Sequence, residues 1–204
     1  RQMCIRDSGI HILGLGIDPA ASVMREASRI QRDLRIDRAL RIAESLRRSG
    51  LPDLWEAVCE RAKGRAPARP HFAAELVARG IAKHSAAAFK RDLGKGKPGN
   101  VRTDWPAMPG VVQWIHAAGG LAVLAHPARY RIGQRLLGVM LDEFRVCGGD
   151  AIEVVSGRQN DATTSRLIRH AAQRRFAASV GSDFHGLSWQ SRPGNMPVPL
   201  EALA

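Results

Sequence analysis

Histidine and aspartate residues stand at one end of three short apolar segments of this sequence. His11 heads the first segment, His126 follows the second, and Asp183 and His185 follow the third. An aspartate and a histidine two residues apart on an extended segment point to the same side, so a carboxylate oxygen and an imidazole nitrogen can converge on one ion. Mixed histidine and aspartate ligand sets suit Zn, Mn or Fe. The pattern therefore predicts a site for a divalent metal ion.

Taken singly, each of these residues also has an ordinary structural explanation. A D-x-H triplet often arises by chance, as a turn aspartate beside a partly buried histidine. His126 alone is more typical of a core histidine with its hydrogen bonds satisfied. His71, just before a helix, is typical of a helix cap or a surface residue. The remaining histidines, in helical or loop contexts, are predicted to be structural: His84, His116 and His170.

The second half of the chain alternates short apolar runs with helical segments. The runs lie at 121–124, 151–155 and 176–180, and the helical segments at 109–118, 134–146 and 161–174. Such alternation is typical of parallel βα units, whose strands carry site residues at their carboxyl ends. Residues 101–204 are therefore predicted to form part of an α/β barrel or sheet. The run at 11–15 predicts one further, buried strand.

Residues 21–100 are predicted to form a helical insert. Residues 21–48 contain no Gly or Pro and place apolar residues at helical spacing, so they predict one long helix that ends at Ser49-Gly50. Shorter helices are predicted from Pro52 to about Arg61, at about 72–79 and at about 85–93. Residues 94–100 (GKGKPGN) predict a loop rich in glycine and lysine.

The net charge of +12 and the sequence pI near 11.0 favour polyanionic partners such as nucleic acid or phosphorylated substrates. Many basic residues, however, fall at 25–48 and 61–69, on expected solvated helix faces. Three scattered cysteines argue against a disulfide framework and a zinc knuckle. No apolar run is long enough to span a membrane, and residues 1–8 lack a signal-peptide core, so the expected location is the cytoplasm.

Several motifs, in one order, resemble the polymerase and histidinol phosphatase (PHP) family of metal-dependent phosphoesterases. The clearest are LAHP at 124–127, followed by Arg129 and Tyr130, and GSDFH at 181–185. The others are HILGL at 11–15 with IDP at 17–19, RPHFA at 69–73, the loop 95–101 before Trp105, GGLAV at 119–123 and GGDAIEV at 148–154. Over about residues 9–194 they are most similar to the subgroup of 3′,5′-nucleotide bisphosphate phosphatases and RNase AM.

This resemblance implies a distorted (β/α)7 barrel with a helical insert and a cluster of two or three divalent ions. Mn is implied first, with Zn, Fe or Mg as alternatives. The implied metal ligands are His11, His126, Asp183 and His185, of which the last three form the implied catalytic set. The implied contacts to substrate phosphate are His71, Arg129 and Tyr130. The implied reaction is hydrolysis of a phosphate ester of a nucleotide 3′,5′-bisphosphate or a short RNA 5′ end by a metal-bound hydroxide.

The sequence departs from this family at its start. The family's first motif, H-x-H-x-x-S-D-G, does not occur, nor do the strand with the next histidine and the glutamate that precedes the equivalent of His11. About five of nine implied ligands are therefore missing. We expect an N-terminally truncated chain with weak or no activity. In it, residues 1–20 are a remnant of the N-terminal barrel part, 21–100 the insert and 101–204 the C-terminal barrel part.

Two other functions remain open from the sequence. A non-catalytic nucleic-acid-binding protein would use the basic insert and the lysine-glycine loop. Another metal hydrolase, such as an amidohydrolase, would also place histidine and aspartate at strand ends. A chelator separates a binder from a metallohydrolase, because the binder keeps its affinity and the hydrolase loses turnover.

Overall fold

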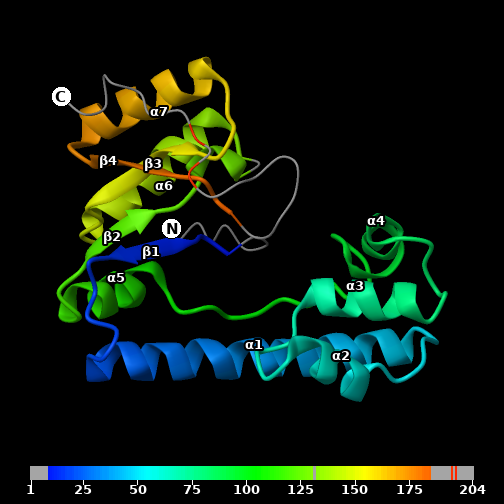
Figure 1. The fold of residues 1–204 in the computed structure, drawn as a ribbon. Helices are drawn as coiled ribbons and strands as arrows, with labels where there is room; N and C mark the ends of the chain where they lie inside the picture. Colours follow the sequence, from blue (N-terminus) through cyan, green and yellow to red (C-terminus); the bar gives the residue numbers. More distant parts are fainter. Residues whose placement is uncertain (1–8, 131, 185–193, 195, 197–204) are drawn as a thin grey trace. The chain divides into compact units, whose positions relative to one another are not determined.

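The structure is a computed structural model, and it describes residues 9–130, 132–184, 194 and 196 (Figure 1). The chain divides into two compact units. Arg1–Arg25 and Pro106–Ala204 form one, which we call the sheet unit, and Glu26–Trp105 form the other, the helical unit. Among the described residues, no helix combines the length and the apolar character that a membrane span needs.

A four-stranded sheet with the strand order β1-β2-β3-β4 forms the centre of the sheet unit. Its strands are β1 (Ile12–Leu15), β2 (Leu121–Leu124), β3 (Ala151–Ser156) and β4 (Ala177–Gly181). β3 runs parallel to both β2 and β4, with Val123 opposite Ala151 and Ile152 opposite Ala178. The predicted parallel strands are confirmed. Because parallel strands end at the same edge, the residues that follow β2, β3 and β4 lie along one edge of the sheet.

β1 differs from the predicted buried strand. It pairs antiparallel with β2, with Ile12 opposite Leu124, and within the described part of the chain no other strand pairs with it. Leu13 and Leu15 are 38% and 47% exposed. A short apolar run does not distinguish a central strand from an edge strand, because that depends on what covers each face.

Three helices pack on this sheet: α5 (Met108–Ala117), α6 (Gln134–Val146) and α7 (Asp161–Arg174). α5 contacts β1 and β2, and α7 contacts α6, β3 and β4. Their apolar side chains join those of the strands in one core, which includes Leu124, Leu141, Phe144, Ile152 and Leu167. The predicted helices of this half are therefore confirmed, and their buried faces hold the strand ends in place.

The helical unit has its own core. It contains most of α1 (Ser22–Arg48), with α2 (Trp55–Ala62), α3 (Arg69–Ala78) and α4 (Ser85–Ala88). Ile42, Leu46, Val58, Phe72 and Leu76 are fully buried in it. The helix predicted at 85–93 is α-helical only to Ala88. A π-helical turn, Phe89–Leu93, follows, and the Gly94 N–H donates to the Phe89 carbonyl at 2.7 Å.

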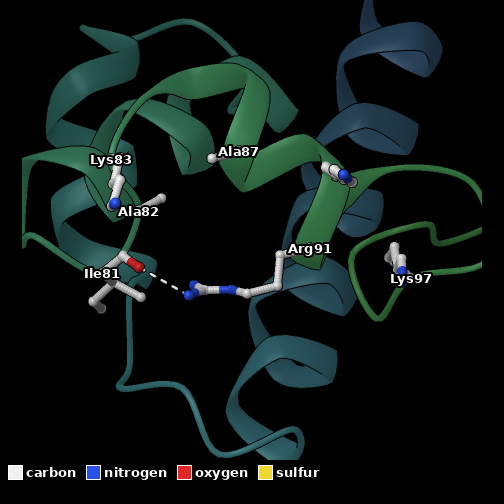
Figure 2. A pocket seen from close by; sticks show the side chains of 7 residues that line it. Ile81, Ala82, Lys83, Ala87, Arg91 and Lys97 are labelled. Atoms are coloured by element: carbon white, nitrogen blue, oxygen red, sulfur yellow. Dashed lines mark hydrogen bonds between the residues drawn. The ribbon is translucent and has the colours of Figure 1, made fainter.

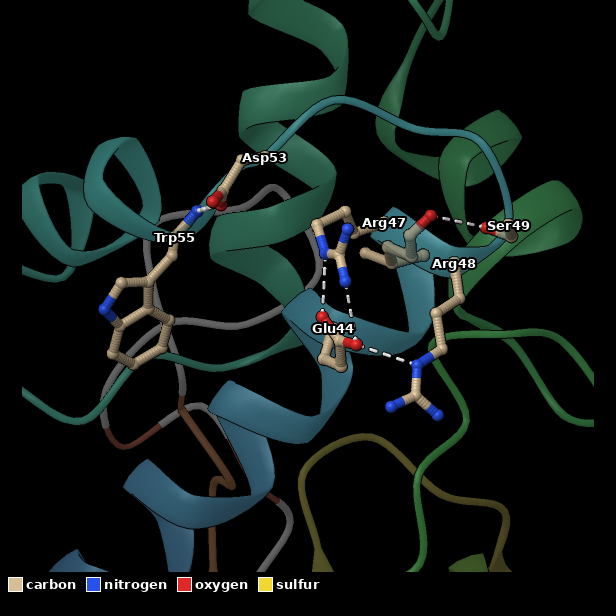
Figure 3. A network of polar contacts seen from close by, with 7 residues as sticks. Glu44, Arg47, Arg48, Ser49, Asp53 and Trp55 are labelled. Carbon is tan, nitrogen blue, oxygen red and sulfur yellow. Dashed lines mark hydrogen bonds and ion pairs between the residues drawn. The ribbon is translucent and has the colours of Figure 1, made fainter.

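Carboxylates on α1 neutralise several of its arginines. Glu26 pairs with Arg29, and Glu44 accepts hydrogen bonds from both Arg47 and Arg48 (Figure 3). Hydrogen bonding to Arg47, and then to Arg48, lowers the pKa of Glu44 to about 2. These pairs are exposed and contribute little to stability. They confirm that this part of the basic composition lies on a solvated helix face.

A buried carboxylate, Glu75 of α3, links two arginines of the helical unit. Glu75 is 6% exposed and accepts from Arg61 of α2 at 2.5 Å and from Arg79 at 2.7 Å. Hydrogen bonding to Arg61 is the largest cause of a lowered pKa for Glu75. A lowered pKa in the folded state stabilises the protein above the unfolded value, and that contribution is lost as the pH falls through the folded pKa.

We therefore predict that Glu75→Gln lowers the free energy of unfolding by about 1–2 kcal/mol at neutral pH. The difference from the unsubstituted chain should begin to close as the pH falls below the ordinary glutamate pKa of 4.5, because the unfolded chain then takes up the proton. It should be lost as the pH falls through the lowered pKa of the folded carboxyl. Urea unfolding across this pH range measures it, with Glu56→Gln on the exposed side of α2 as the control. A difference that does not change with pH would rule out the ionic link.

Candidate metal centre

Two imidazole rings meet at one end of the β1–β2 pair. His11 directly precedes β1 and His126 follows Ala125 after β2, and the Ala125 N–H donates to the His11 carbonyl at 3.0 Å. His126 Nε2 lies 3.0 Å from His11 Nδ1, and the ring centroids are 4.8 Å apart. Two imidazole nitrogens bound to one tetrahedral ion lie about 3.3 Å apart. The two nitrogens are therefore close enough to bind one divalent ion after the rings reorient.

Tyr130 supports His11 from inside the fold. The His11 N–H donates to Tyr130 Oη at 2.8 Å, and the Tyr130 ring centroid lies 5.5 Å from that of His126. Tyr130 is 8% exposed, and this burial raises the pKa of its phenol to about 12, although the His11 hydrogen bond acts in the opposite direction. The phenol therefore stays protonated at neutral pH and holds the backbone of His11.

Glu153, in the middle of β3, holds the backbone of His126. The His126 N–H donates to Glu153 Oε2 at 2.6 Å, and His126 has a φ of 37°, in the left-handed region that costs a non-glycine residue energy. Burial is the largest influence on the pKa of Glu153 and raises it. The His126 hydrogen bond opposes that rise, and the charge of Asp183 adds to it.

Gly181, at the end of β4, makes room for this carboxylate. A Cβ atom on Gly181 would lie 2.3 Å from Glu153 Oε1. The motif GGDAIEV was part of the family resemblance, but no role was predicted for its glutamate. A charged residue in an otherwise apolar strand could have revealed it, because glutamate is almost never fully buried without a partner.

Asp183 follows β4 and pairs with Arg129, which follows β2. Arg129 Nη1 donates to Asp183 Oδ2, and Nη2 donates to the Ser156 carbonyl at the end of β3, 3.3 Å away. The Asp183 side chain is 10% exposed and that of Arg129 is 52% exposed. Arg129 thus joins the ends of three strands, and part of its guanidinium still faces solvent.

The predicted site residues divide into groups. His11, His126 and Tyr130 lie together, and Asp183 lies with Arg129. His71 belongs to the helical unit, where its Nδ1 accepts from the Ala68 N–H at 3.0 Å at the start of α3. His185 lies outside the described residues. Over the described part of the chain, no group of three or more His, Cys, Asp or Glu side chains is placed to hold a metal ion.

The other histidines make structural contacts, as predicted. His116 Nε2 lies 2.8 Å from Asp150 Oδ2, which also accepts from the Ala122 N–H. His84 accepts from the Ala87 N–H at the start of α4. Asp150 thus ties α5 to β2, away from the carboxyl ends of the strands.

Comparison with known proteins places this geometry in a family, although no family model matches the chain. It is 36% identical over 179 residues to a 3′,5′-nucleoside bisphosphate phosphatase of Chromobacterium violaceum, covering 86% of this chain and 62% of that protein. It is 40% identical over 176 residues to the 5′-3′ exoribonuclease Rnm of Salmonella typhimurium, covering 86% and 60%. The chain spans 60–64% of the length of the curated relatives it matches.

Two solved structures share the fold. One, named an amidohydrolase of Chromobacterium violaceum with bound sulfate and no metal, has a TM-score of 0.82 at 34% identity and covers 95% of this chain and 68% of its own. The other, named a metal-dependent phosphoesterase of Bifidobacterium adolescentis, has a TM-score of 0.77 at 26% identity and covers 97% and 70%. Together with the strand-end histidines and aspartate, these similarities show that the chain belongs to the PHP-type family of metal-dependent phosphoesterases.

Proposed function

We propose that this chain is the larger part of a metal-dependent phosphoesterase that hydrolyses a phosphate ester of a nucleotide 3′,5′-bisphosphate or a short RNA 5′ end. The observation that carries the proposal is the pair of imidazole nitrogens of His11 and His126, 3.0 Å apart at the end of the β1–β2 pair. The relatives' names supply the substrate classes, a nucleoside bisphosphate and RNA. A bound sulfate in a structural neighbour supports a tetrahedral anion as ligand.

In this proposal His11 Nδ1, His126 Nε2, Asp183 and His185 hold a divalent ion, Mn or alternatively Zn, Fe or Mg. Such an ion lowers the pKa of a bound water and neutralises charge on the attacked phosphoryl group. Tyr130 holds the backbone of His11, so that its ring faces His126. The reaction needs no nucleophilic side chain from the protein.

Arg129, Tyr130 and His71 are the proposed contacts to substrate phosphate. The Arg129 guanidinium is about half exposed while one of its nitrogens pairs with Asp183. Its planar fork suits a phosphate oxygen on the open side. His71 would bind through Nε2, because its Nδ1 accepts from the Ala68 backbone and the proton therefore lies on the other nitrogen.

We also propose which parts of the chain form the barrel, and that this chain does not contain the whole metal site. Residues 1–20 and 101–204 would belong to one distorted (β/α)7 barrel, with 21–100 as its insert, acting in the cytoplasm on nucleotides or short RNA. The described residues bring together fewer ligands than the two or three ions of the family require. We therefore propose that this chain alone holds one ion and has little or no activity.

Hydrolysis tests the proposed function. The chain would be compared with a version extended at its start by the matching motifs of the Salmonella relative, using adenosine 3′,5′-bisphosphate and a 5′-phosphorylated RNA with Mn²⁺. We expect release of phosphate or nucleotide only by the extended version, abolished by EDTA. In the extended version, His126→Ala should lower kcat/KM by more than about 100-fold. Substitution of residues that merely support metal ligands already lowers activity by up to about 100-fold.

His116→Ala in the extended version is the matched control, because this histidine pairs with Asp150 away from the strand ends. It should leave kcat/KM nearly unchanged. Hydrolysis that persists in EDTA, or no phosphoester hydrolysis by either version, would refute the proposal. RNA binding that survives EDTA without any hydrolysis would favour the second candidate, a nucleic-acid-binding protein, for which the basic helical unit is the supporting observation.

A further inference from the structure

A basic hollow lies on the helical unit, at the motif GKGKPGN that the proposed chemistry does not use. It has a volume of about 510 Å³ (Figure 2). Its lining combines an apolar part, Ile81, Ala82 and Ala87, with four cationic residues, Lys83, Lys90, Arg91 and Lys97. The chain contains only five lysines, and four of them fall between residues 83 and 97. Lysine is therefore concentrated at this hollow, whereas arginine carries the rest of the positive charge.

Arg91 is part of the wall and does not offer a free charge. Its Nη1 donates to the Ile81 carbonyl at 2.8 Å, as Figure 2 shows, and its Nε donates to the buried Asp92 carboxylate at 2.9 Å. Hydrogen bonding to Asp92 raises the pKa of Arg91. The bond to Ile81 ties the π-helical turn Phe89–Leu93, which carries Lys90, to the segment that carries Lys83.

The loop that carries Lys97 is fixed to the same turn at both of its ends. The Gly94 N–H donates to the Phe89 carbonyl and the Gly99 N–H donates to the Asp92 carbonyl, each at 2.7 Å. A Cβ atom would lie 2.6 Å from the Phe89 oxygen at Gly94, and 3.0 Å from the Asp92 oxygen at Gly99. The close approach of two backbones requires glycine at both positions, so the glycines of the motif position Lys97 at the hollow.

Within the residues that the structure describes, the charges of the three lysines are left without an opposite partner. Lys83, Lys90 and Lys97 are exposed, and among the described residues no carboxylate forms an ion pair with any of them. The arginines of α1 differ, because Glu26 and Glu44 form ion pairs with three of them. An ammonium group is a compact point charge that binds phosphate without a fixed orientation.

We infer that this hollow binds the phosphodiester backbone of single-stranded RNA, with one nucleotide against its apolar part and neighbouring phosphates on Lys83, Lys90 and Lys97. The volume falls within the range of about 300–1,000 Å³ of small-ligand pockets, which one nucleotide fits. Contacts to phosphate carry no base preference, as an enzyme acting on RNA ends of any sequence needs. The inference rests on the proposed function for the choice of RNA as the polyanion.

Fluorescence anisotropy with a labelled single-stranded oligoadenylate tests the inference, in EDTA so that no hydrolysis occurs. The variant Lys83→Gln/Lys90→Gln/Lys97→Gln should raise Kd by more than about tenfold at low salt. The slope of log K against log salt concentration should fall in magnitude by about 2, since each phosphate contact on a single strand contributes about 0.7. Lys97→Gln alone should lower that slope by about one third of this amount.

The matched control is Arg32→Gln/Arg35→Gln/Arg65→Gln, which removes three exposed charges from the same unit outside the hollow. It should change Kd by less than about threefold, through the net charge alone. Equal losses in both triple variants, or no loss in the lysine variant, would overturn the inference. Binding is measured without metal, so the two proposals can fail separately. If the lysine variant binds RNA as well as the unsubstituted chain while the extended version hydrolyses its substrate, only the inference about the hollow is overturned. Lysine-dependent binding without hydrolysis overturns only the proposed function.

Discussion

Gly181→Ala is expected to lower the free energy of unfolding by about 1–3 kcal/mol. The new Cβ atom would lie 2.3 Å from Glu153 Oε1, so the carboxylate must move. Glu153 is 6% exposed, and its other oxygen is held by the His126 N–H at 2.6 Å. Moving it therefore breaks a buried hydrogen bond and removes the contact that holds the His126 backbone in its left-handed conformation.

A glycine-to-alanine substitution on α6 should instead raise the free energy of unfolding. A Cβ atom on Gly138 would find its nearest neighbour, the flexible end of Arg174, at 3.4 Å. Gly138→Ala is thus expected to stabilise the chain by about 0.5–1 kcal/mol, because alanine loses less backbone entropy in a helix. Urea unfolding of both variants measures the contrast.

A double-mutant cycle then tests the proposed cause. In a Glu153→Ala background, Gly181→Ala should cost less than half of its effect in the unsubstituted chain, since the obstructing carboxylate is gone. An undiminished cost in that background would show that the clash with Glu153 is not the reason for glycine at this position.

Much of the sheet unit was predictable from its sequence, because short apolar runs alternate with helical segments that end in glycine. The strands at 121–124 and 151–156 and the helix at 134–146 lie within a residue of their predicted bounds. Among the described residues β1 lies at the edge of the sheet, which was not predictable because it depends on which strands pair with it. The π-helical turn after Ala88 was missed because the backbone contact between Phe89 and Gly94 has no periodic signature.

The sequence was enough to predict which residues belong to the candidate site. It was not enough to predict which of them contact one another. Strand-end positions indicated His126 and Asp183 as ligands, which remains a prediction. His126 and His11 lie 115 positions apart in the sequence, and their pairing depends on the β1–β2 register. The ion pair between Arg129 and Asp183 likewise requires β2 and β4 to flank β3. Glu153 supports the site although sequence reasoning gave it no role.

We propose that His11 and His126 bind the same divalent ion. His126 Nε2 and His11 Nδ1 already face each other, and Glu153 and Tyr130 hold the two backbones from within the fold. Removing one imidazole should therefore cost more than removing a residue around the ligands, which typically weakens a metal site about 10–100-fold. We expect His126→Ala to abolish measurable binding of Mn²⁺ to this chain.

The decisive measurement is Mn²⁺ binding by electron paramagnetic resonance, with pulsed detection of ¹⁴N coupling from bound imidazole. We expect one Mn²⁺ site with ¹⁴N coupling in the unsubstituted chain, no such site in His126→Ala, and an unchanged site in His116→Ala. Thermal unfolding of each variant shows that it remains folded. An unsubstituted chain that binds no Mn²⁺, or a folded His126→Ala variant that keeps the site and its ¹⁴N coupling, would contradict the claim.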